Sequence, residues 1–459
     1  MQHQLLPNVT RVHFVGIGGS GMSPLAEILH SLGYVISGSD VNESDNVARM
    51  RSLGIAVQLP QKAENVGDAE LVVYTAAVQA DNPELVAAKE RGIPLMERAT
   101  LLGLLSRGYK NTVAVAGTHG KTTTSSMLSH ILLKAEKDPS IFIGGRLPLI
   151  GANGKAGRSD TFVCEACEFK DHYLQMTPAI SIILNVDADH LDYFGDLDGV
   201  IASFRQFATQ TTDTLIVNAD DASTLKAVAG LTHATVVRYG KDLKNDWSAQ
   251  HIRTVNGSYG QYDLHHNGVF VGTVTLGVPG EHNVFNSLSA TAAAYLCGVS
   301  YEQIVDGIAD FHGAGRRFEF LGEAGGVTIV DDYAHHPTEI AATLAAAKAL
   351  PYKRVWALFQ PFTFSRTARH LDEFAAALSA ADTALVCDIM GSRETNEWNV
   401  SSKEITDRID GAHYLPTFDD LRDFVVAHAE EGDLVLTMGG GDIYKCARMI
   451  KASLERKDA

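Results

Sequence analysis

The chain has 459 residues and a formal net charge of −17, with 45% hydrophobic and 20% charged residues. It is too long for one hydrophobic core, so we expect two to four domains. The acidic balance excludes a nucleic-acid-binding surface, which needs clustered basic residues. No apolar run reaches the roughly 18 residues that a membrane-spanning helix requires, and we identify no signal peptide. Five cysteines are too few for a disulfide framework, so we expect a cytoplasmic protein with reduced thiols.

The first block, residues 1–110, alternates predicted strands with predicted helices. Strands are expected at 11–15, 34–37 and 71–75, and a helix with one apolar face is expected at 22–32. This alternation is typical of βαβ units in a parallel sheet. We therefore predict a Rossmann-like domain.

The second block, residues 111–320, begins with a buried strand that leads into a glycine-rich turn. Its predicted strands lie at 112–116, 181–184 and 214–217, and an Ala-rich helix is predicted at 286–296. Between about 232 and 276, short alternating runs and Asn-Gly turns predict hairpins, which we expect to form an antiparallel appendage. We predict a central P-loop ATPase-like domain with a mixed sheet.

The third block, residues 321–459, returns to alternating strands and helices. Its predicted strands lie at 327–330, 354–358, 383–386 and 433–436. Glycines around 313–322 predict a hinge before this second Rossmann-like domain. The predicted fold class is therefore α/β, with three domains.

A glycine-rich segment after the strand at 112–116 carries the strongest chemical signal. It consists of Gly117, Thr118, His119, Gly120, Lys121, Thr122 and Thr123. A turn of this kind gathers backbone N–H groups at a helix N-terminus, where they bind phosphate. Lys121 can reach the β- and γ-phosphates of a nucleotide, and the Thr122 hydroxyl can ligate Mg²⁺. The Walker A pattern requires a glycine at position 115, where this chain has Val115, so a structural turn that happens to contain Lys-Thr is the alternative.

Acidic residues follow two other predicted strands. Glu165 and Glu168 follow the strand at 161–164, and residues 187–192, which include His190, follow the strand at 181–184. Because the carboxyl ends of parallel strands converge on one crevice, these side chains can hold Mg²⁺ against phosphate oxygens. A solvated acidic loop is the alternative. Cys164 and Cys167 form a CxxC without a second pair at zinc spacing, so we expect two cysteines bordering a buried strand end.

A second glycine-rich turn follows the strand at 11–15. It contains Gly16, Gly18 and Gly21, and Asp40 ends the next predicted strand. This spacing matches the dinucleotide-binding fingerprint and by itself favours an NAD-dependent dehydrogenase. The physical requirement is only a diphosphate, which a UDP-sugar also carries.

Longer strings resemble the Mur ligases, which build the peptide stem of the bacterial cell wall. The resemblance covers almost the whole chain and rests on the shortened loop 117–123 and on segments 13–23, 331–339 and 359–361 with Arg366. These segments are similar to the family member that joins L-alanine to UDP-N-acetylmuramate. The resemblance implies an ATP- and Mg²⁺-dependent ligase of peptidoglycan synthesis that acts through an acyl phosphate, as a monomer or homodimer.

The resemblance also implies roles for individual residues. In 1–110 the UDP-sugar is expected beside Gly18, Ser20, Gly21, Met22, Ser23, Ser39, Asp40 and Arg98, with residues 75–78 as further candidates. In 111–320, ATP is expected on the loop 117–123, with adenine beside His282 and Asn283, and Mg²⁺ on Thr122, Glu165 and His190. In 321–459, Asp332 is expected to bind the ATP ribose, His336 to face the amino acid as a candidate general base, and Arg366 to bind substrate carboxylates. Arg316, at the predicted hinge, is favoured over Arg317 to stabilise the transferring phosphoryl group. The expected catalytic residues are Lys121, Glu165, His190, Arg316 and His336.

Several alternatives stay open at this point. Cys167 stands where the family usually has an acid, so a role of that acid does not transfer to this chain. No lysine lies between His190 and Lys226, so we expect no carbamylated lysine there. A ligase that adds a whole tripeptide to the same sugar nucleotide, and an inactive UDP-sugar sensor, are the competing functions. L-alanine, glycine and L-serine are hard to separate, because one methyl group is worth only about 1–3 kcal/mol in a pocket.

Overall fold

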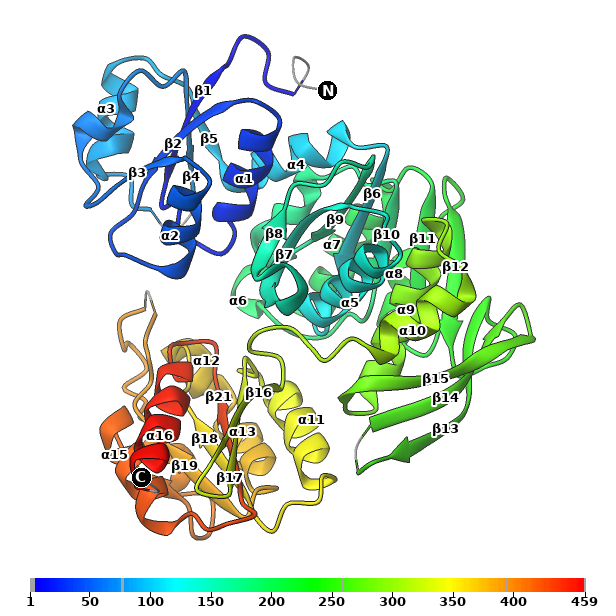
Figure 1. Ribbon diagram of the computed structural model, residues 1–459, viewed down its shortest axis with the longest axis vertical. Helices are drawn as coiled ribbons and strands as arrows, with labels where there is room; N and C mark the ends of the chain where they lie inside the picture. Colours follow the sequence, from blue (N-terminus) through cyan, green and yellow to red (C-terminus); the bar gives the residue numbers. More distant parts are fainter. Residues whose placement is uncertain (1–4, 76–77, 258, 393, 458–459) are drawn as a thin grey trace. The chain divides into compact units, whose positions relative to one another are not determined.

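The computed structural model describes residues 5–75, 78–257, 259–392 and 394–457 (Figure 1). Contacts within the chain divide the protein into two compact units. The first consists of Met1–Gln250, Asp263–Val274 and Phe285–Phe311, and the second of His251–Tyr262, Thr275–Val284 and His312–Ala459. The described residues form three β-sheets, two of which contain both parallel and antiparallel strand pairs. This arrangement confirms the α/β fold class with three sheet-containing domains.

The N-terminal sheet has the strand order β3-β2-β1-β4-β5, with parallel pairing throughout. This order matches five of the six strands of the Rossmann order 3-2-1-4-5-6, in which ligands bind beyond the carboxyl ends of the strands. Its elements are β1 (Arg11–Val15), α1 (Ser23–Ser31), β2 (Val35–Ser39), α2 (Asp45–Ser52), β3 (Ala56–Gln58), η1 (Ala63–Val66), β4 (Leu71–Tyr74), α3 (Pro83–Glu90), β5 (Leu95–Glu97) and α4 (Arg98–Gly108). The strand predicted at 34–37 runs two residues further, to Ser39, which places Ser39 inside the sheet.

The central sheet has the order β15-β14-β13-β12-β11-β10-β6-β9-β7-β8. β6 pairs in parallel with both β9 and β10, whereas β7 and β8 pair antiparallel. The elements that surround the glycine-rich loop are β6 (Asn111–Ala116), α5 (Lys121–Lys134), β7 (Ser140–Leu147), η2 (Pro148–Ile150), β8 (Ala152–Lys155), β9 (Thr161–Glu165), η3 (Phe169–Gln175) and β10 (Ile180–Ile183). The sheet continues through α6 (Leu191–Phe194), α7 (Leu197–Thr209), β11 (Thr214–Asn218), α8 (Ala222–Val228), β12 (Thr235–Gly240), β13 (Trp247–Val255), β14 (Tyr259–His266), β15 (Val269–Pro279), α9 (His282–Leu296) and α10 (Tyr301–Ala309).

The region 232–276 differs from the predicted appendage in one respect. Its first strand, β12, pairs in parallel with β11, and β13 continues in parallel beside β12. β13, β14 and β15 therefore extend the central sheet and do not form a separate structure. The Asn-Gly turns are present as expected: Asn256 and Asn267 adopt positive φ, as does the glycine after each of them.

The C-terminal sheet has the order β16-β17-β21-β18-β19-β20 and is parallel except for the β16–β17 pair. Its elements are β16 (Glu319–Ala324), β17 (Val327–Asp332), α11 (Pro337–Lys348), β18 (Val355–Phe359), α12 (Phe364–Arg369), α13 (Leu371–Leu378), β19 (Thr383–Val386), α14 (Lys403–Thr406), β20 (His413–Tyr414), α15 (Phe418–His428), β21 (Leu434–Met438) and α16 (Tyr444–Lys457). Gly322, predicted as part of a hinge, lies inside β16 beside a register shift, so this part of the hinge segment is a paired strand.

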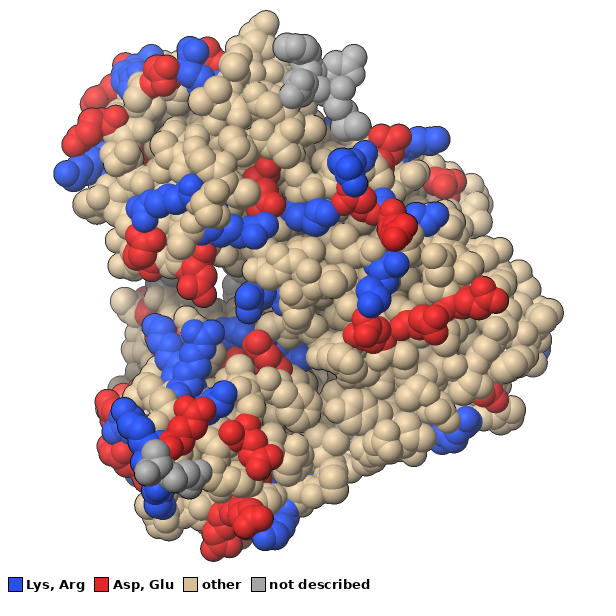
Figure 2. All heavy atoms as spheres, in the orientation of Figure 1, with Lys and Arg blue, Asp and Glu red and all other residues tan. Residues whose placement is uncertain are grey.

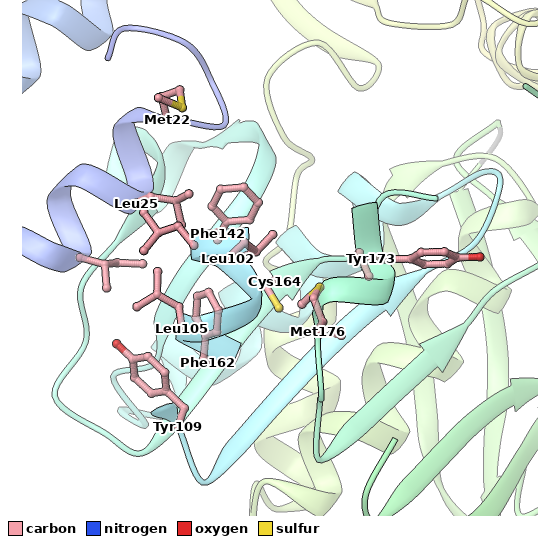
Figure 3. Packing of buried hydrophobic residues seen from close by; sticks show 14 of the residues in the cluster. Met22, Leu25, Leu102, Leu105, Tyr109, Phe142, Phe162, Cys164, Tyr173 and Met176 are labelled. Atoms are coloured by element: carbon pink, nitrogen blue, oxygen red, sulfur yellow. The ribbon is translucent and has the colours of Figure 1, made fainter. Parts of the chain in front are cut away.

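One hydrophobic cluster joins the N-terminal sheet to the first part of the central sheet. Met22, the N-cap residue of α1, packs together with Leu25 of α1, Leu105 of α4, and Phe142 and Phe162 of the central domain (Figure 3). All five are buried, and burial of each large apolar side chain contributes about 1.5–3 kcal/mol. This shared core fixes the position of the glycine-rich turn at 16–21 relative to β9, the strand that ends at Glu165.

Charged side chains of both signs are interspersed over the face shown in Figure 2. In the part of the chain that the structure describes, no helix combines the length and the apolar character needed to cross a bilayer.

Candidate active site

The turn from β6 into α5 depends on two glycines. Gly117 has φ +145° and Gly120 has φ +85°, which are backbone conformations that residues with a Cβ rarely adopt. A Cβ at Gly117 would lie 2.9 Å from the Cβ of Leu184, and one at Gly120 would lie 2.7 Å from Oδ1 of Asn286. These contacts explain why the loop is glycine at both positions, while Val115, inside the buried strand β6, needs no such freedom.

Asn185, two residues after the neighbouring strand β10, holds the loop through hydrogen bonds. Its carbonyl oxygen accepts the N–H of Thr118 at 3.1 Å, and its side-chain oxygen accepts the N–H of His119 at 2.8 Å. Its amide group in turn donates to the carbonyl of His119 at 3.0 Å. The prediction did not include Asn185, although its place directly after a predicted strand was an available signal.

Lys121 lies across the loop that precedes it. Its Nζ donates to the carbonyl oxygens of Gly117 and Thr118, at 2.5 and 3.0 Å, and forms an ion pair with Glu168 at 2.9 Å. Burial, the largest single effect, acts to lower the pKa of Lys121, but the neighbouring groups, above all the Glu168 carboxylate, together outweigh it, so the pKa is raised. Lys121 therefore carries a positive charge held against the carbonyl side of the loop and the Glu168 carboxylate.

A carboxylate cradle lies beside Lys121, formed by Glu165 at the end of β9. Its two oxygens accept hydrogen bonds from the hydroxyls of Thr122 at 3.1 Å and Ser125 at 3.0 Å, and from the N–H of Gly144. A Cβ at Gly144 would lie 2.8 Å from a Glu165 oxygen and 3.0 Å from the Thr122 hydroxyl. Ser125 and Gly144 were not predicted, and Gly144 gave no signal in the sequence.

The structure thus brings together Thr122 and Glu165, two of the three predicted metal ligands. His190, the third, begins α6 with a left-handed backbone (φ +54°) and packs its ring on Phe169 at 5.0 Å between centroids. In residues 5–75, 78–257, 259–392 and 394–457, no three His, Cys, Asp or Glu side chains form a preassembled metal site. Mg²⁺ fits the cradle nonetheless, because it binds oxygen and takes one or two carboxylates together with phosphate oxygens and water.

A cavity of about 360 Å³ extends from the first glycine-rich turn to Glu165. Its lining includes Ser20, Gly21 and Met22 from the first turn, Arg98 from α4, and Gly144, Glu165 and Cys167 from the central sheet. Arg98 covers Gly21, where a Cβ would lie 3.1 Å from the arginine Cδ. Asn153 of β8 also donates to the carbonyl of Ser20. The cavity therefore runs from the predicted diphosphate loop to the predicted metal carboxylate.

Other predicted residues of the first domain lie around this loop. Asp40 accepts the N–H of Gly18 at 2.8 Å, which explains the acidic residue at the end of the second strand. Ser23 begins α1 and is buried, and Ser39 is fully buried, with its hydroxyl donating to Glu84. Of the predicted segment 75–78, Ala76 and Ala77 lie outside the described residues.

The two cysteines of the CxxC differ in environment. Cys164 is buried in β9, where burial raises the pKa of its thiol, whereas Cys167 lines the cavity. Both cysteines carry free thiols, as the interpretation of a strand-end pair expects.

Residues predicted in the second unit lie at the carboxyl end of its sheet. Asp332 ends β17 and accepts the N–H groups of Phe318 and Ala334, both at 2.7 Å. Burial raises the pKa of Asp332 to about 6, against the opposing effects of Arg317 and the two backbone N–H groups. Asp332 is therefore a carboxyl that changes its charge close to neutral pH.

Arg316 was predicted as an arginine that can swing onto a phosphoryl group, but in the structure several contacts hold its side chain. Its guanidinium donates to Asp331 at 3.0 Å and to the carbonyls of Gly441 and Gly439 at 2.8 and 2.7 Å. It also lies 4.9 Å from the ring centres of Tyr333 and Tyr444. A swing onto a phosphoryl group would require these contacts to break, which is costly for a guanidinium with a buried carboxylate partner.

The remaining predicted residues occupy helix ends. His336 caps α11 by accepting the N–H of Thr338 at 3.4 Å through Nδ1, and Arg366 lies in α12. His282 and Asn283 form the first turn of α9, which begins four residues earlier than predicted. Asn283 is buried and donates to the carbonyl of Pro279 at 2.7 Å.

Comparison with known proteins agrees with this geometry. Three family models match the chain: the Mur ligase family, catalytic domain, at residues 11–110; the Mur ligase middle domain at 115–294; and the Mur ligase, glutamate ligase domain, at 316–441. The chain belongs to the Mur ligase family. This confirms the resemblance on which the predictions rest and decides against the dehydrogenase alternative.

Two relatives that match nearly the whole chain are ligases of the same kind. A UDP-N-acetylmuramate–L-alanine ligase of Caldanaerobacter subterraneus subsp. tengcongensis is 46% identical over 446 residues, which are 96% of this chain and 97% of the relative. The same kind of ligase from Clostridium botulinum is 42% identical over 443 residues, 95% of this chain and 96% of the relative.

Solved structures give the same result. A UDP-N-acetylmuramate-alanine ligase of Thermotoga maritima matches with a TM-score of 0.83 and 29% identity, covering 97% of this chain and 99% of that one. A murein peptide ligase of Psychrobacter arcticus matches with a TM-score of 0.75 and 26% identity over the same shares.

The close approach at Gly144 leads to a first prediction. Gly144→Ala should displace the Glu165 carboxylate and lower turnover by about 100-fold, since displacements near 1 Å in an active site have effects of that size. Gly272→Ala is the matched control, because a Cβ there meets only Val305, at an ordinary 3.5 Å. Turnover of both variants under saturating substrates tests this, and equal activities would refute the cradle.

The raised pKa of Asp332 leads to a second prediction. The folded protein binds this proton more tightly than the unfolded chain does, so ionisation of Asp332 destabilises the fold. This destabilisation grows as pH rises from about 4 to about 6 and is constant above that range. Asp332→Asn should therefore gain melting temperature relative to the parent between about pH 4 and pH 7. A difference in melting temperature that is the same at both pH values contradicts the assignment.

Proposed function

We propose that this chain is an ATP-dependent ligase that joins L-alanine to UDP-N-acetylmuramate in peptidoglycan precursor synthesis. One observation carries the proposal: a single cavity extends from the diphosphate-type turn of the first domain to the Glu165 cradle beside Lys121. This geometry suits a substrate with a diphosphate at one end and a carboxylate to be activated at the other. The activity named for relatives at 46% and 42% identity over nearly the whole chain supports the choice of substrates.

Each domain takes one part of the reaction in this proposal. Residues 1–110 bind the UDP-sugar, with Ser20, Gly21 and Arg98 lining the cavity. Residues 111–320 bind ATP on the loop 117–123, with the adenine beside Asn283 and His282. Residues 321–459 bind the amino acid, for which Arg366 is the candidate carboxylate partner, and Asp332 meets the ATP ribose. We place the enzyme in the cytoplasm, as a monomer or homodimer.

The phosphate loop would orient ATP for transfer of its terminal phosphoryl group. The N-terminus of α5 and the charge of Lys121 together favour the triphosphate, and they act on charge that spreads over the phosphoryl oxygens in the transition state. The sugar's carboxylate attacks the γ-phosphorus in line, ADP leaves, and an acyl phosphate forms. This converts an unreactive carboxylate into an electrophile.

The amine of L-alanine then attacks the acyl carbon, and the tetrahedral intermediate collapses to an amide and phosphate. The amine must first lose a proton, for which His336 is our candidate acceptor. Because Nδ1 of His336 accepts the N–H of Thr338, Nε2 carries the hydrogen of the neutral ring, so His336 could take the amine proton only at Nδ1, after its bond to Thr338 is released.

Thr122 and Glu165 are the residues that we propose to hold Mg²⁺, with His190 as a further candidate. When bound, Mg²⁺ supplies positive charge against the phosphate oxygens. The hydroxyl of Thr122 already lies 3.1 Å from a Glu165 oxygen, so both ligands are held by the fold. Of the two hinge arginines, Arg317 is now an equal candidate for the transferring phosphoryl group, because Arg316 already holds Asp331, Gly439 and Gly441.

Release of phosphate tests the proposed function directly. The enzyme, ATP, Mg²⁺ and UDP-N-acetylmuramate should release phosphate when L-alanine is added, and more slowly with glycine or L-serine. A murein tripeptide is the decisive comparison, because a murein peptide ligase shares this fold. Release with the tripeptide but with none of the three amino acids would replace the proposal with that activity.

The position of Lys121 leads to a further prediction. Lys121→Ala should lower ligation at least 100-fold, as expected for loss of a charge that stabilises the transition state, and should leave UDP-N-acetylmuramate binding intact. Lys134→Ala, at the other end of α5, pairs with Asp310 on the surface and serves as the matched control. Turnover near that of the parent in Lys121→Ala would refute the assignment of the loop, whatever the control shows.

A further inference from the structure

Glu84 is a fully buried carboxylate to which neither the sequence nor the proposed mechanism gives a role. It lies in the first turn of α3, where Asn82 caps the helix by accepting the N–H of Glu84 at 3.0 Å. A helix N-terminus stabilises negative charge. The fold therefore provides a place for a charge that would be costly to bury alone.

The carboxylate of Glu84 gathers donors from three other segments. Ser39 donates from the end of β2, and Nε2 of His13, on β1, lies 3.3 Å away. Asn65 and the N–H of Lys62 donate from the connection around η1, at 2.7 and 3.2 Å. Burial acts to raise the pKa of Glu84, but the hydrogen bonds from His13, Ser39 and Asn65 outweigh it and lower the pKa. Glu84 thus remains charged and holds these segments at one point.

Ser39 passes this constraint to the diphosphate-type turn. Its carbonyl oxygen accepts the N–H groups of both Gly16 and Ile17, each at 2.9 Å. The next residue, Asp40, accepts the N–H of Gly18 at 2.8 Å. Three successive N–H groups of the turn are therefore bonded to two residues at the end of β2, and the first of those residues is bonded to Glu84.

The turn has little room to move away from this anchor. A Cβ at Gly18 would lie 2.8 Å from Val47 and 2.9 Å from the Asp40 carboxylate. The residues that line the cavity, Ser20, Gly21 and Met22, follow directly in the chain. A shift at the end of β2 would therefore be transmitted to the part of the turn that faces the ligand.

We propose that Glu84 is a positioning residue for sugar-nucleotide binding: through Ser39 it sets the turn at residues 16–22 in the shape that accepts a diphosphate. It acts without touching the ligand. This inference rests on the proposed function for the identity of the ligand, and it adds a determinant of affinity that lies outside the cavity.

Two variants test the role of Glu84. Glu84→Gln keeps the size of the side chain and removes its charge, and Ser39→Ala removes only the hydroxyl that donates to Glu84, while the carbonyl that accepts from the turn remains. Both should raise the KM for UDP-N-acetylmuramate about tenfold, as expected for loss of one charge-assisted hydrogen bond. The KM for ATP and kcat should change by less than about twofold, because the ATP loop is built on another sheet.

Glu70→Gln is the matched control. Glu70 lies at the opposite end of the same sheet, where it accepts the N–H groups of Thr10 and Arg11, so its variant should leave both KM values unchanged. A general loss of structure would raise both KM values and lower the melting temperature, which the selective effect excludes. If Glu84→Gln does not fold, Ser39→Ala decides.

The outcomes separate the two proposals. An unchanged KM for the sugar nucleotide in a folded Glu84→Gln or Ser39→Ala variant overturns the role of Glu84, as does an equal rise in both KM values. A parent enzyme that shows no ligation with UDP-N-acetylmuramate refutes the proposed function instead. In that case, calorimetric titration of parent and variants with UDP still measures whether Glu84 sets the affinity of the turn for a diphosphate.

Discussion

The structure of this ligase depends on one backbone constraint, the turn from β6 into α5. The chain must pass from the buried strand into the helix within four residues and leave Lys121 against the carbonyls of Gly117 and Thr118. Only glycine at 117 and 120 permits this, because each has positive φ and no space for a Cβ. A substitution at either position would act on the whole site, whereas most surface changes would have only local effects.

Sheet topology then determines which residues reach that turn. β6 lies between β9 and β10, and all three run in the same direction. Their carboxyl ends therefore deliver Glu165 from one side and Asn185 from the other to the same edge. Lys121 gains its buried partner Glu168 from the segment after β9. The chemistry of this site thus follows from the order of parallel strands, as is general for open α/β sheets.

A second turn, on the N-terminal sheet, likewise follows the carboxyl end of a parallel strand. The cluster shown in Figure 3 packs α1 and α4 against the central domain, so this turn and Glu165 line the same cavity. In the proposed function, a separate binding domain recognises a large sugar nucleotide at one end while phosphoryl transfer takes place at the other. Binding energy from the remote diphosphate can then contribute to positioning the reactive carboxylate.

The sequence predicted those parts of the molecule that have local signals. Strands such as 11–15 and 383–386 were placed correctly, because period and apolar content mark buried strands. The loop 117–123 and Glu165 were found from spacing and from resemblance. The error at 232–276 arose because alternation marks a half-buried strand but does not state which neighbour the strand pairs with.

Other residues could not be predicted because their roles arise from contacts distant in sequence. Gly144 matters only because β7 brings it against the Glu165 carboxylate. In the sequence, Glu84 is indistinguishable from an ordinary acidic residue at a helix start. Only the folded structure shows that it is buried among donors from three segments. Arg316 was predicted as a mobile arginine, but its partners Gly439 and Gly441 lie more than a hundred residues along the chain.

The central claim is that Lys121 and the Glu165 cradle activate a carboxylate by phosphorylation. The most direct test uses UDP-N-acetylmuramate whose carboxylate oxygens carry a heavy oxygen isotope. Mass spectrometry of the phosphate released during ligation to L-alanine should then find one heavy oxygen in each phosphate, transferred through the acyl phosphate. Phosphate that carries no heavy oxygen, released at the same rate as the amide forms, would contradict the account.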